Sequence, residues 1–214
     1  MAVSLRGVAR KYLNVTGNVS VRNNVFGGSV PANASLRNRL VTLARKQYSF
    51  SVSECVFGWT AAFEQTWSHI NIRIRLNPDA GITAATVANL QTTWRNGIVS
   101  SWSDRWGLGR AGEMTCPLTF DVQWVTSNQH HTVRIRPGPA RSNMGTFDDQ
   151  DPGSTAAHEY GHMFGLVDEY AEDDVCPNRN PKNTGTIMDN NTPTVPARMM
   201  NRFATNVGSN VVAI

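Results

Sequence analysis

The sequence predicts a mixed α/β (α+β) domain. Three observations support this class: residues 70–76 alternate strictly between apolar and polar, residues 83–106 carry apolar residues at steps of three and four, and two further alternating runs follow. At 214 residues the chain is long enough to bury a sizeable core without help from disulfides. We expect a small mixed, mainly parallel sheet, a long helix, a second and shorter helix, and a small C-terminal subdomain.

The first 66 residues show a less regular pattern than the rest. Residues 15–25 alternate around Gly and Asn, which is typical of a small hairpin, and residues 36–48 carry apolar side chains at helical spacing. We therefore expect residues 1–66 to be an extension of unknown role, such as a pro-segment, a docking region or an integral part of the fold. Residues 67–214 should form the main domain.

The elements of the main domain follow from periodicity. Alternation at residues 70–76 predicts a strand with one buried face, and the pattern of residues 83–106 predicts a long amphipathic helix. Residues 118–125 and 132–136 alternate again and predict two more strands. A short extended piece is expected at residues 144–147, just before the second helix. This order of strands and helices favours the α/β class.

The charge pattern bears on possible partners. The chain is mildly basic, with a formal net charge of +4 and a pI near 9.3. Its Lys and Arg residues are scattered, and the six Trp residues do not interleave with them as stacking platforms would. We therefore expect a solvated basic surface and no nucleic-acid partner. No apolar run reaches the roughly 18 residues needed to cross a bilayer, so we expect no membrane span.

The cysteines leave the cellular compartment open. Cys55, Cys116 and Cys176 are far apart and form no CxxC pair, which disfavours a cysteine zinc site. One disulfide, with Cys116–Cys176 as the expected pair, and three reduced thiols are alternatives. The first thirty residues contain no continuous apolar segment of the signal-peptide type. A signal removed upstream, another export route and a cytoplasmic location therefore all stay open.

The strongest chemical signal is the motif His158-Glu159-x-x-His162. Residues four apart on a helix lie on one face, so both imidazoles can reach one Zn²⁺ at about 2.0–2.1 Å. Glu159 lies near the same side and could take a proton from zinc-bound water. The preceding Pro-Gly favours a helix start with Ser154 or Thr155 as the N-cap. Two surface histidines on an ordinary helix would give the same short motif.

Two residues after the motif weaken that simpler interpretation. Gly165 comes three residues after His162, where a glycine can end the helix in a left-handed conformation. Asp168 comes six residues after His162, close enough to return as a third ligand. Two His and one carboxylate would leave a fourth position open for water, as a catalytic zinc site requires. We therefore expect one catalytic Zn²⁺.

The segment from His158 to Asp168, HEYGHMFGLVD, resembles the extended HExxHxxGxxD signature of the metzincin zinc metallopeptidases. It is most similar to the snapalysin variant, a group of small secreted bacterial peptidases with Asp as the third ligand. The resemblance is specific over residues 154–190. It implies His158, His162 and Asp168 as zinc ligands and Glu159 as the general base. It also implies a methionine in a tight turn beneath the metal, for which Met188 is the best placed.

The resemblance implies a zinc-dependent endopeptidase with residues 67–214 as its metzincin-like catalytic domain. A protein or peptide substrate would lie extended along an edge strand, for which residues 144–147 are the candidate. The secreted relatives favour an exported or extracellular location. Alternatives are a zinc amidase acting on cell-wall peptide, a protease toxin delivered into another cell, and a catalytically silent metal-binding protein. The oligomeric state and the cleavage preference have no signal in the sequence.

Some family features are absent or contested. The tyrosine that some members place two residues after the turn methionine is replaced by Asn190, and Tyr170 is better explained by core packing than as its substitute. Met199 and Met200 compete with Met188. A different clan uses a later aspartate in a Gly-Thr-x-Asp context, which makes Asp189 the runner-up ligand.

Two acidic segments could bind Ca²⁺ through carboxylate oxygens. These are residues 148–151 and residues 172–174. Neither has the EF-hand spacing, so solvated loops are the preferred interpretation and Ca²⁺ is only a secondary possibility.

Overall fold

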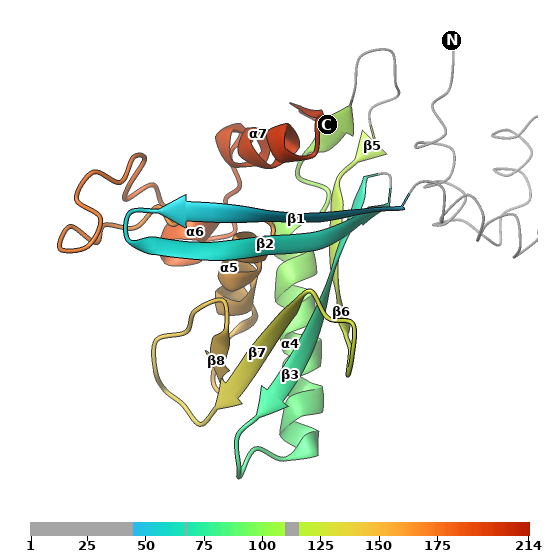
Figure 1. The fold of residues 1–214 in the computed structure, drawn as a ribbon, viewed down its shortest axis with the longest axis vertical. Helices are drawn as coiled ribbons and strands as arrows, with labels where there is room; N and C mark the ends of the chain where they lie inside the picture. The colour runs from blue at the N-terminus through green and yellow to red at the C-terminus, as the bar shows by residue number, and fades with distance from the viewer. Residues whose placement is uncertain (1–44, 67, 110–115) are drawn as a thin grey trace, which may run out of the picture.

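The structure is a computed structural model that describes residues 45–66, 68–109 and 116–214. The chain folds into a mixed α/β structure with a six-stranded open sheet, a second sheet of three short strands, and several helices (Figure 1). Helices α4 and α5 pack against each other, and they also contact strands of the large sheet. This agrees with the α/β (α+β) class predicted from the sequence.

The large sheet begins with a long antiparallel hairpin. Strand β1 (Arg45–Glu54) pairs with β2 (Phe57–Thr66) over its full length, and β2 pairs antiparallel with β3 (His69–Pro78). The boundary expected after residue 66 therefore falls between two paired strands of one sheet. The hairpin expected at residues 15–25, like the rest of residues 1–44, lies outside the described residues.

The other edge of β3 pairs with two strands in succession. Residues 69–74 pair parallel with β6 (Thr119–Trp124), and residues 74–78 pair parallel with β7 (His131–Arg136). Strand β8 (Thr146–Asp148) then pairs parallel with β7 and forms an edge of the sheet. The strands expected at residues 70–76, 118–125, 132–136 and 144–147 are thus confirmed, with small shifts of their ends.

Three short strands form the second sheet. Strand β4 (Gly107–Gly109) pairs antiparallel with β5 (Cys116–Pro117) on one side and with β9 (Asn210–Val212) on the other. Helix α7 (Ala197–Asn206) precedes β9 and buries its apolar face in the core. The C-terminal residues therefore fold back onto the segment that follows the long helix.

The long helix α4 (Ala84–Trp102) is confirmed, although it ends four residues earlier than expected. Its N-cap is Thr83, whose hydroxyl accepts a hydrogen bond from the Thr86 amide at 3.1 Å. Apolar residues at steps of three and four, including Trp94 and Trp102, are buried.

Helix α5 (Gly153–Met163) crosses α4 at two glycines. A Cβ placed on Gly97 would lie 2.2 Å from the carbonyl oxygen of Gly153, so neither position has room for a side chain. The helix begins directly after Pro152, and no side chain caps it. The expected N-cap at Ser154 or Thr155 is therefore wrong: both residues lie inside the first turn, because close packing on α4 brings the glycine into the helix.

An aromatic cluster fixes the C-terminal end of α5. The ring of Phe164, the residue after the helix, lies 4.9 Å from Trp102, 5.0 Å from Phe120 and 5.6 Å from Phe203, measured between ring centroids. All four residues are fully buried. This packing, which joins two helices, a strand and the end of α5, fixes the position of the helix that carries the motif.

The expected helix at residues 36–48 is wrong where it can be compared. Residues 45–48 belong to β1, and residues 36–44 lie outside the described residues. From Tyr48 the side chains that face inward alternate, as Phe50 and Val52 show, and pairing with β2 enforces this period of two. No helix in the described parts of the chain has the length and apolar character needed to cross a membrane.

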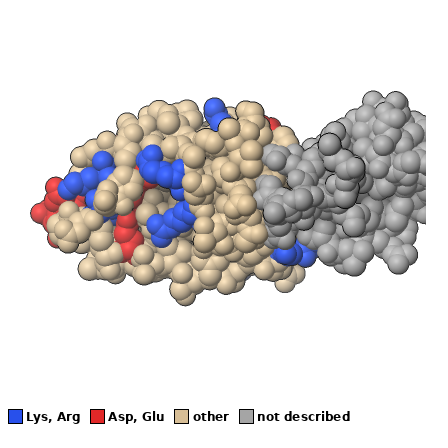
Figure 2. All heavy atoms as spheres, turned by 90° about the horizontal axis from the view of Figure 1, so that it is seen from above, with Lys and Arg blue, Asp and Glu red and all other residues tan. Residues whose placement is uncertain are grey.

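The charged residues are unevenly distributed over the surface. On the face seen in Figure 2, Lys and Arg side chains lie in separate groups within a largely uncharged surface, and several of them lie beside Asp and Glu at one end. Among the described residues, several basic side chains take part in ion pairs, for example Arg95 with Asp121 and Arg134 with Asp79. Part of the charge of the described residues is therefore neutralised locally.

Candidate metal centre

Helix α5 presents two imidazoles on one face and then reverses direction. The rings of His158 and His162 lie one turn apart, with centroids 5.1 Å from each other. The helix ends in a Schellman arrangement, in which Gly165 donates to the His162 carbonyl and Leu166 donates to the Gly161 carbonyl, both at 3.0 Å. Gly165 has φ +104, as expected from the sequence, and this conformation turns the chain back towards the helix.

The reversal brings Asp168 between the two histidines. Its Oδ1 lies 3.0 Å from Nε2 of His158 and 3.1 Å from Nε2 of His162. Within the described residues, these three side chains form a group whose ligand atoms all lie within 4.8 Å of one another and could hold a metal ion. The three ligands predicted from the sequence are therefore brought together.

The outer nitrogens show how the rings are oriented. His158 Nδ1 lies 2.8 Å from the Ile187 carbonyl oxygen, and His162 Nδ1 lies 2.9 Å from that of Leu166. A carbonyl oxygen only accepts, so each Nδ1 carries a hydrogen, and Nε2 is the nitrogen that faces Asp168 and that a metal ion would bind once it is deprotonated. Two Nε2 atoms and a carboxylate oxygen converge on one point, an arrangement that fits a bound cation.

The charges at this point are strongly coupled. Burial alone would lower the pKa of His162, but the hydrogen bond to Asp168 and the negative charges of Asp168 and Glu159 outweigh it and raise that pKa to about 9. For Asp168, burial raises the pKa, yet its contacts with both histidines hold the pKa well below the usual range. The carboxylate is therefore ionised, as a metal ligand must be.

The second oxygen of Asp168 is held from the opposite side. Its Oδ2 accepts a hydrogen bond from the Tyr170 hydroxyl at 2.9 Å and lies 3.8 Å from Nη2 of Arg179. The Arg179 side chain is only 1% exposed, and its guanidinium lies 4.7 Å from the centre of the Tyr170 ring. Tyr170 is half-buried and lines the cleft beside the metal ligands. The expectation of simple core packing for Tyr170 is therefore wrong.

Glu159, the expected general base, lies on α5 directly after His158. Its side chain is buried and contributes to the lining of the same cleft as the three candidate ligands. Burial raises the pKa of this carboxyl, although the nearby histidines act in the opposite direction. A raised pKa favours a group that takes and returns a proton near neutral pH.

The expected turn methionine lies behind the ligand-bearing helix. Helix α6 (Ile187–Asn190) contains Met188, which is fully buried, and a Cβ placed on Gly161 of α5 would lie 2.5 Å from its sulfur. The preceding carbonyl, that of Ile187, is the one that orients His158. Met199 and Met200, the competitors, are buried in α7 instead.

Asp189, the runner-up ligand, lies in the cleft lining but is not part of the candidate ligand group. Its Oδ2 accepts a hydrogen bond from the Gly185 amide at 2.7 Å and so closes the turn before α6. The structure therefore groups Asp168, and not Asp189, with the two histidines.

The two acidic segments considered for Ca²⁺ have local partners. The first holds the loop before β8: Asp148 accepts from the Ala140 amide at 3.0 Å, and Asp149 accepts from the Gly138 amide at 2.8 Å. In the second segment, Glu172 pairs with Arg141 at 3.1 Å and Asp173 pairs with a lysine. These carboxylates therefore stabilise loops of the described structure.

The candidate ligands open onto a cleft of about 720 Å³. One wall consists of the turn end of the β1–β2 hairpin, the other of residues 140–145 before β8, and α5 contributes the floor. The hairpin is joined to the floor, since Trp59 Nε1 donates to the His162 carbonyl oxygen at 2.9 Å and its ring lies 5.4 Å from the imidazole. Trp59 has no local signal in the sequence, because it lies 103 residues before His162.

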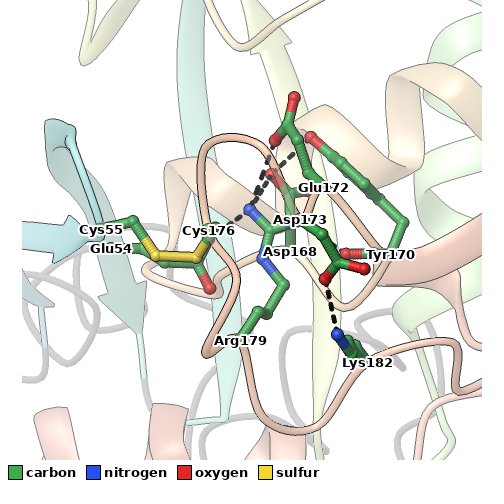
Figure 3. Close-up of a disulfide and its surroundings, with 9 residues drawn as sticks. All are labelled: Glu54, Cys55, Asp168, Tyr170, Glu172, Asp173, Cys176, Arg179 and Lys182. Atoms are coloured by element: carbon green, nitrogen blue, oxygen red, sulfur yellow. Dashed lines mark hydrogen bonds and ion pairs between the residues drawn. A yellow bond between two sulfur atoms is a disulfide. The ribbon is translucent and has the colours of Figure 1, made fainter.

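A disulfide joins the same hairpin to the loop after α5. Cys55, in the β1–β2 turn, is bonded to Cys176, and next to it Glu54 forms an ion pair with Arg179 at 3.1 Å (Figure 3). The expected pair Cys116–Cys176 is therefore wrong. The spacing of the cysteines in the sequence does not identify the partner of Cys176, because Cys55 comes close to it only in the folded chain.

Comparison of the chain with protein-family models, curated proteins and solved structures gave no match. What can be said of its function therefore comes from the residues and the geometry of the candidate metal centre.

Proposed function

We propose that this chain is a zinc-dependent endopeptidase of the metzincin type. The observation that carries the proposal is the convergence of His158 Nε2, His162 Nε2 and Asp168 Oδ1 on one point at the floor of an open cleft. Two imidazoles and one carboxylate are a donor set found in catalytic zinc sites, where a further position is left for water. A purely structural zinc site would instead be closed by four protein ligands.

Each residue has a role in this proposal. Zinc held by the three ligands would supply a water of lowered pKa and polarise the scissile carbonyl. Glu159 would take a proton from the attacking water and deliver it to the leaving amine. Its burial and raised pKa support this assignment, because the carboxyl would have to hold the proton between the two transfers. Tyr170 and Arg179 would hold Asp168 in its ligating orientation.

The family assignment rests on several features taken together. The HExxHxxGxxD signature is supported by the left-handed Gly165 and by Met188, which packs beneath the ligand-bearing helix. Strand β8 lies at the sheet edge, and residues 140–145 directly before it line the cleft, where an extended peptide could pair with the main chain. A disulfide is typical of an oxidising compartment, which supports an exported protein.

The test is hydrolysis of unfolded casein by the purified chain, before and after treatment with a zinc chelator. We expect activity that the chelator removes and that added zinc restores. Glu159→Ala should keep its zinc and lose turnover by about 10²-fold or more. Full activity of Glu159→Ala would remove the assigned base. Hydrolysis of cell-wall peptide in place of casein would make the protein a zinc amidase.

A further inference from the structure

The turn of the β1–β2 hairpin, here called the hairpin tip (residues 54–57), is fastened to the loop that carries the third candidate ligand. The Cys55–Cys176 disulfide and the Glu54–Arg179 ion pair join the two segments side by side (Figure 3). In Figure 1 the hairpin tip lies at the same end of the molecule as this loop. The hairpin tip is therefore held in place by a covalent bond and a buried charge.

The hairpin continues from its tip along the cleft. Phe57, Gly58 and Trp59, the first residues of β2, line the cleft together with the candidate ligands. The Trp59 indole donates a hydrogen bond to the carbonyl oxygen of His162, so this wall is attached to α5 as well as to the loop. Two independent attachments thus fix the distance between the hairpin tip and the candidate metal ligands.

The hairpin tip exposes apolar side chains. Val56 is 76% exposed and Phe57 is 44% exposed, and they are consecutive residues. Within the described residues, the other large hydrophobic side chains exposed in this way are Val212 and Ile214, near the C-terminus. Covering this apolar pair with an apolar group lowers the free energy of the system. The cost is small because the pair is already held rigidly and loses little conformational entropy.

The opposite wall offers complementary chemistry. Met144, from the loop before β8, lines the cleft, and so do its neighbours Asn143 and Gly145. A thioether side chain adapts to apolar groups of different shape. The cleft therefore has apolar side chains on both walls, with the candidate metal ligands between them.

We infer that the hairpin tip is a substrate-binding wall that takes a large apolar side chain of a peptide, close to the bond that is cleaved. Phe57 would contact this side chain directly, and Val56 would extend the apolar surface towards solvent. The inference rests on the proposed peptidase function. It adds the residues that would select the substrate, because Val56 and Phe57 would contact a large aliphatic or aromatic side chain of the peptide.

The experiment compares pairs of short peptides that differ only in Phe or Asn at one position, scanned along the peptide. With the wild-type chain we expect kcat/KM to favour the Phe peptide at one or two adjacent positions. The double variant Val56→Asp, Phe57→Asp should reduce that preference by about 10-fold or more, mainly through KM, with unchanged zinc content. Phe57→Leu should retain most of the preference.

Ile214→Asp is the matched control, because it places the same charge at another exposed apolar residue, 60% exposed. It should leave the peptide preference unchanged. An unaltered preference in the double variant, or an equal loss in Ile214→Asp, would overturn the inference.

A binding measurement separates this inference from the peptidase proposal. In the Glu159→Ala background, the dissociation constants of the same Phe and Asn peptides are measured with and without the hairpin-tip substitutions. If the wild-type chain cleaves no peptide but the Phe peptide still binds in a manner that depends on the hairpin tip, the peptidase proposal is wrong and the assignment of the hairpin tip as a peptide-binding wall is supported. If peptides are cleaved but their dissociation constants do not change with the hairpin-tip substitutions, only the assignment of the hairpin tip is wrong.

Discussion

Gly161 packs directly against Met188. A Cβ placed on Gly161 would lie 2.5 Å from Sδ of Met188 and 3.1 Å from Cζ2 of Trp102. The missing side chain lets the turn before Met188 approach α5 closely enough for the Ile187 carbonyl to reach Nδ1 of His158. Gly161 and His158 are three residues apart and lie on the same side of the helix, so packing at Gly161 helps to orient the imidazole.

Gly161→Ala should therefore disturb both stability and metal binding. The added methyl group must displace the end of Met188 or the Trp102 ring, and such overpacking costs about 1–3 kcal/mol of unfolding free energy. We expect a lower urea midpoint and weaker zinc binding. Gly58→Ala is the control, since its Cβ would meet only the Val52 carbonyl oxygen at 3.9 Å. Equal urea midpoints and zinc affinities for the two variants would contradict this packing.

The two candidate aspartates should differ in zinc affinity. Asp168→Ala removes a carboxylate oxygen that lies about 3 Å from both imidazoles, whereas Asp189→Ala removes the acceptor of the Gly185 amide. We expect Asp168→Ala to weaken zinc binding by more than the roughly 10–100-fold typical of residues that only support a ligand. Asp189→Ala should stay near the wild-type value in a chelator competition assay. The opposite ranking would move the third ligand to Asp189.

His130 should make the fold sensitive to acid. Burial, the charge of Arg73 and the neighbouring His131 lower the pKa of His130 to about 4. The neutral ring accepts a hydrogen bond from the Arg73 amide at 3.0 Å, so the folded state disfavours the protonated form. Between pH 6.5 and 4 the unfolded chain binds more protons at this residue than the folded chain, so its contribution to stability falls as the pH is lowered.

The measurement is the urea midpoint of wild type and of His130→Asn at several pH values. The wild-type chain should lose more stability between pH 6.5 and 4 than the variant does. Parallel pH profiles would show that His130 does not titrate in this way. Other acid-sensitive groups act equally in both proteins and cancel in the comparison.

The Cys55–Cys176 disulfide should be a major source of stability. It joins residues 121 apart, and crosslinks that close long loops typically stabilise by about 2–4 kcal/mol through the unfolded state. A reductant should lower the urea midpoint accordingly. Cys116→Ser should leave this difference unchanged, because Cys116 is not part of the bond. If the effect of the reductant disappeared in Cys116→Ser, the pairing would be different.

Local sequence patterns predicted the elements that depend on local interactions. The alternation of residues 70–76 predicted β3, and the spacing of residues 83–106 predicted most of α4. The candidate metal centre was also predictable, because His158, His162 and the returning Asp168 lie within eleven residues of one another and Gly165 supplies the turn between them. Helical geometry and one left-handed residue suffice to bring these side chains together.

The parts that sequence patterns missed depend on contacts between distant segments. Trp59 reaches His162 from 103 residues away, and Cys55 reaches Cys176 from 121 residues away. Neither contact produces a local period. The helical spacing at residues 36–48 was misleading at its end, because pairing with β2 makes residues 45–48 a strand. The cleft wall formed by the hairpin could therefore not be predicted from the sequence.

The most direct test of the metal centre is X-ray absorption spectroscopy of the chain after removal of all metal and reloading with zinc. The account predicts one zinc per chain, with a first coordination shell of nitrogen and oxygen that includes two imidazoles, and loss of the imidazole signal in the variant His158→Ala, His162→Ala. A chain that takes up no zinc, or a shell that contains sulfur, would contradict it.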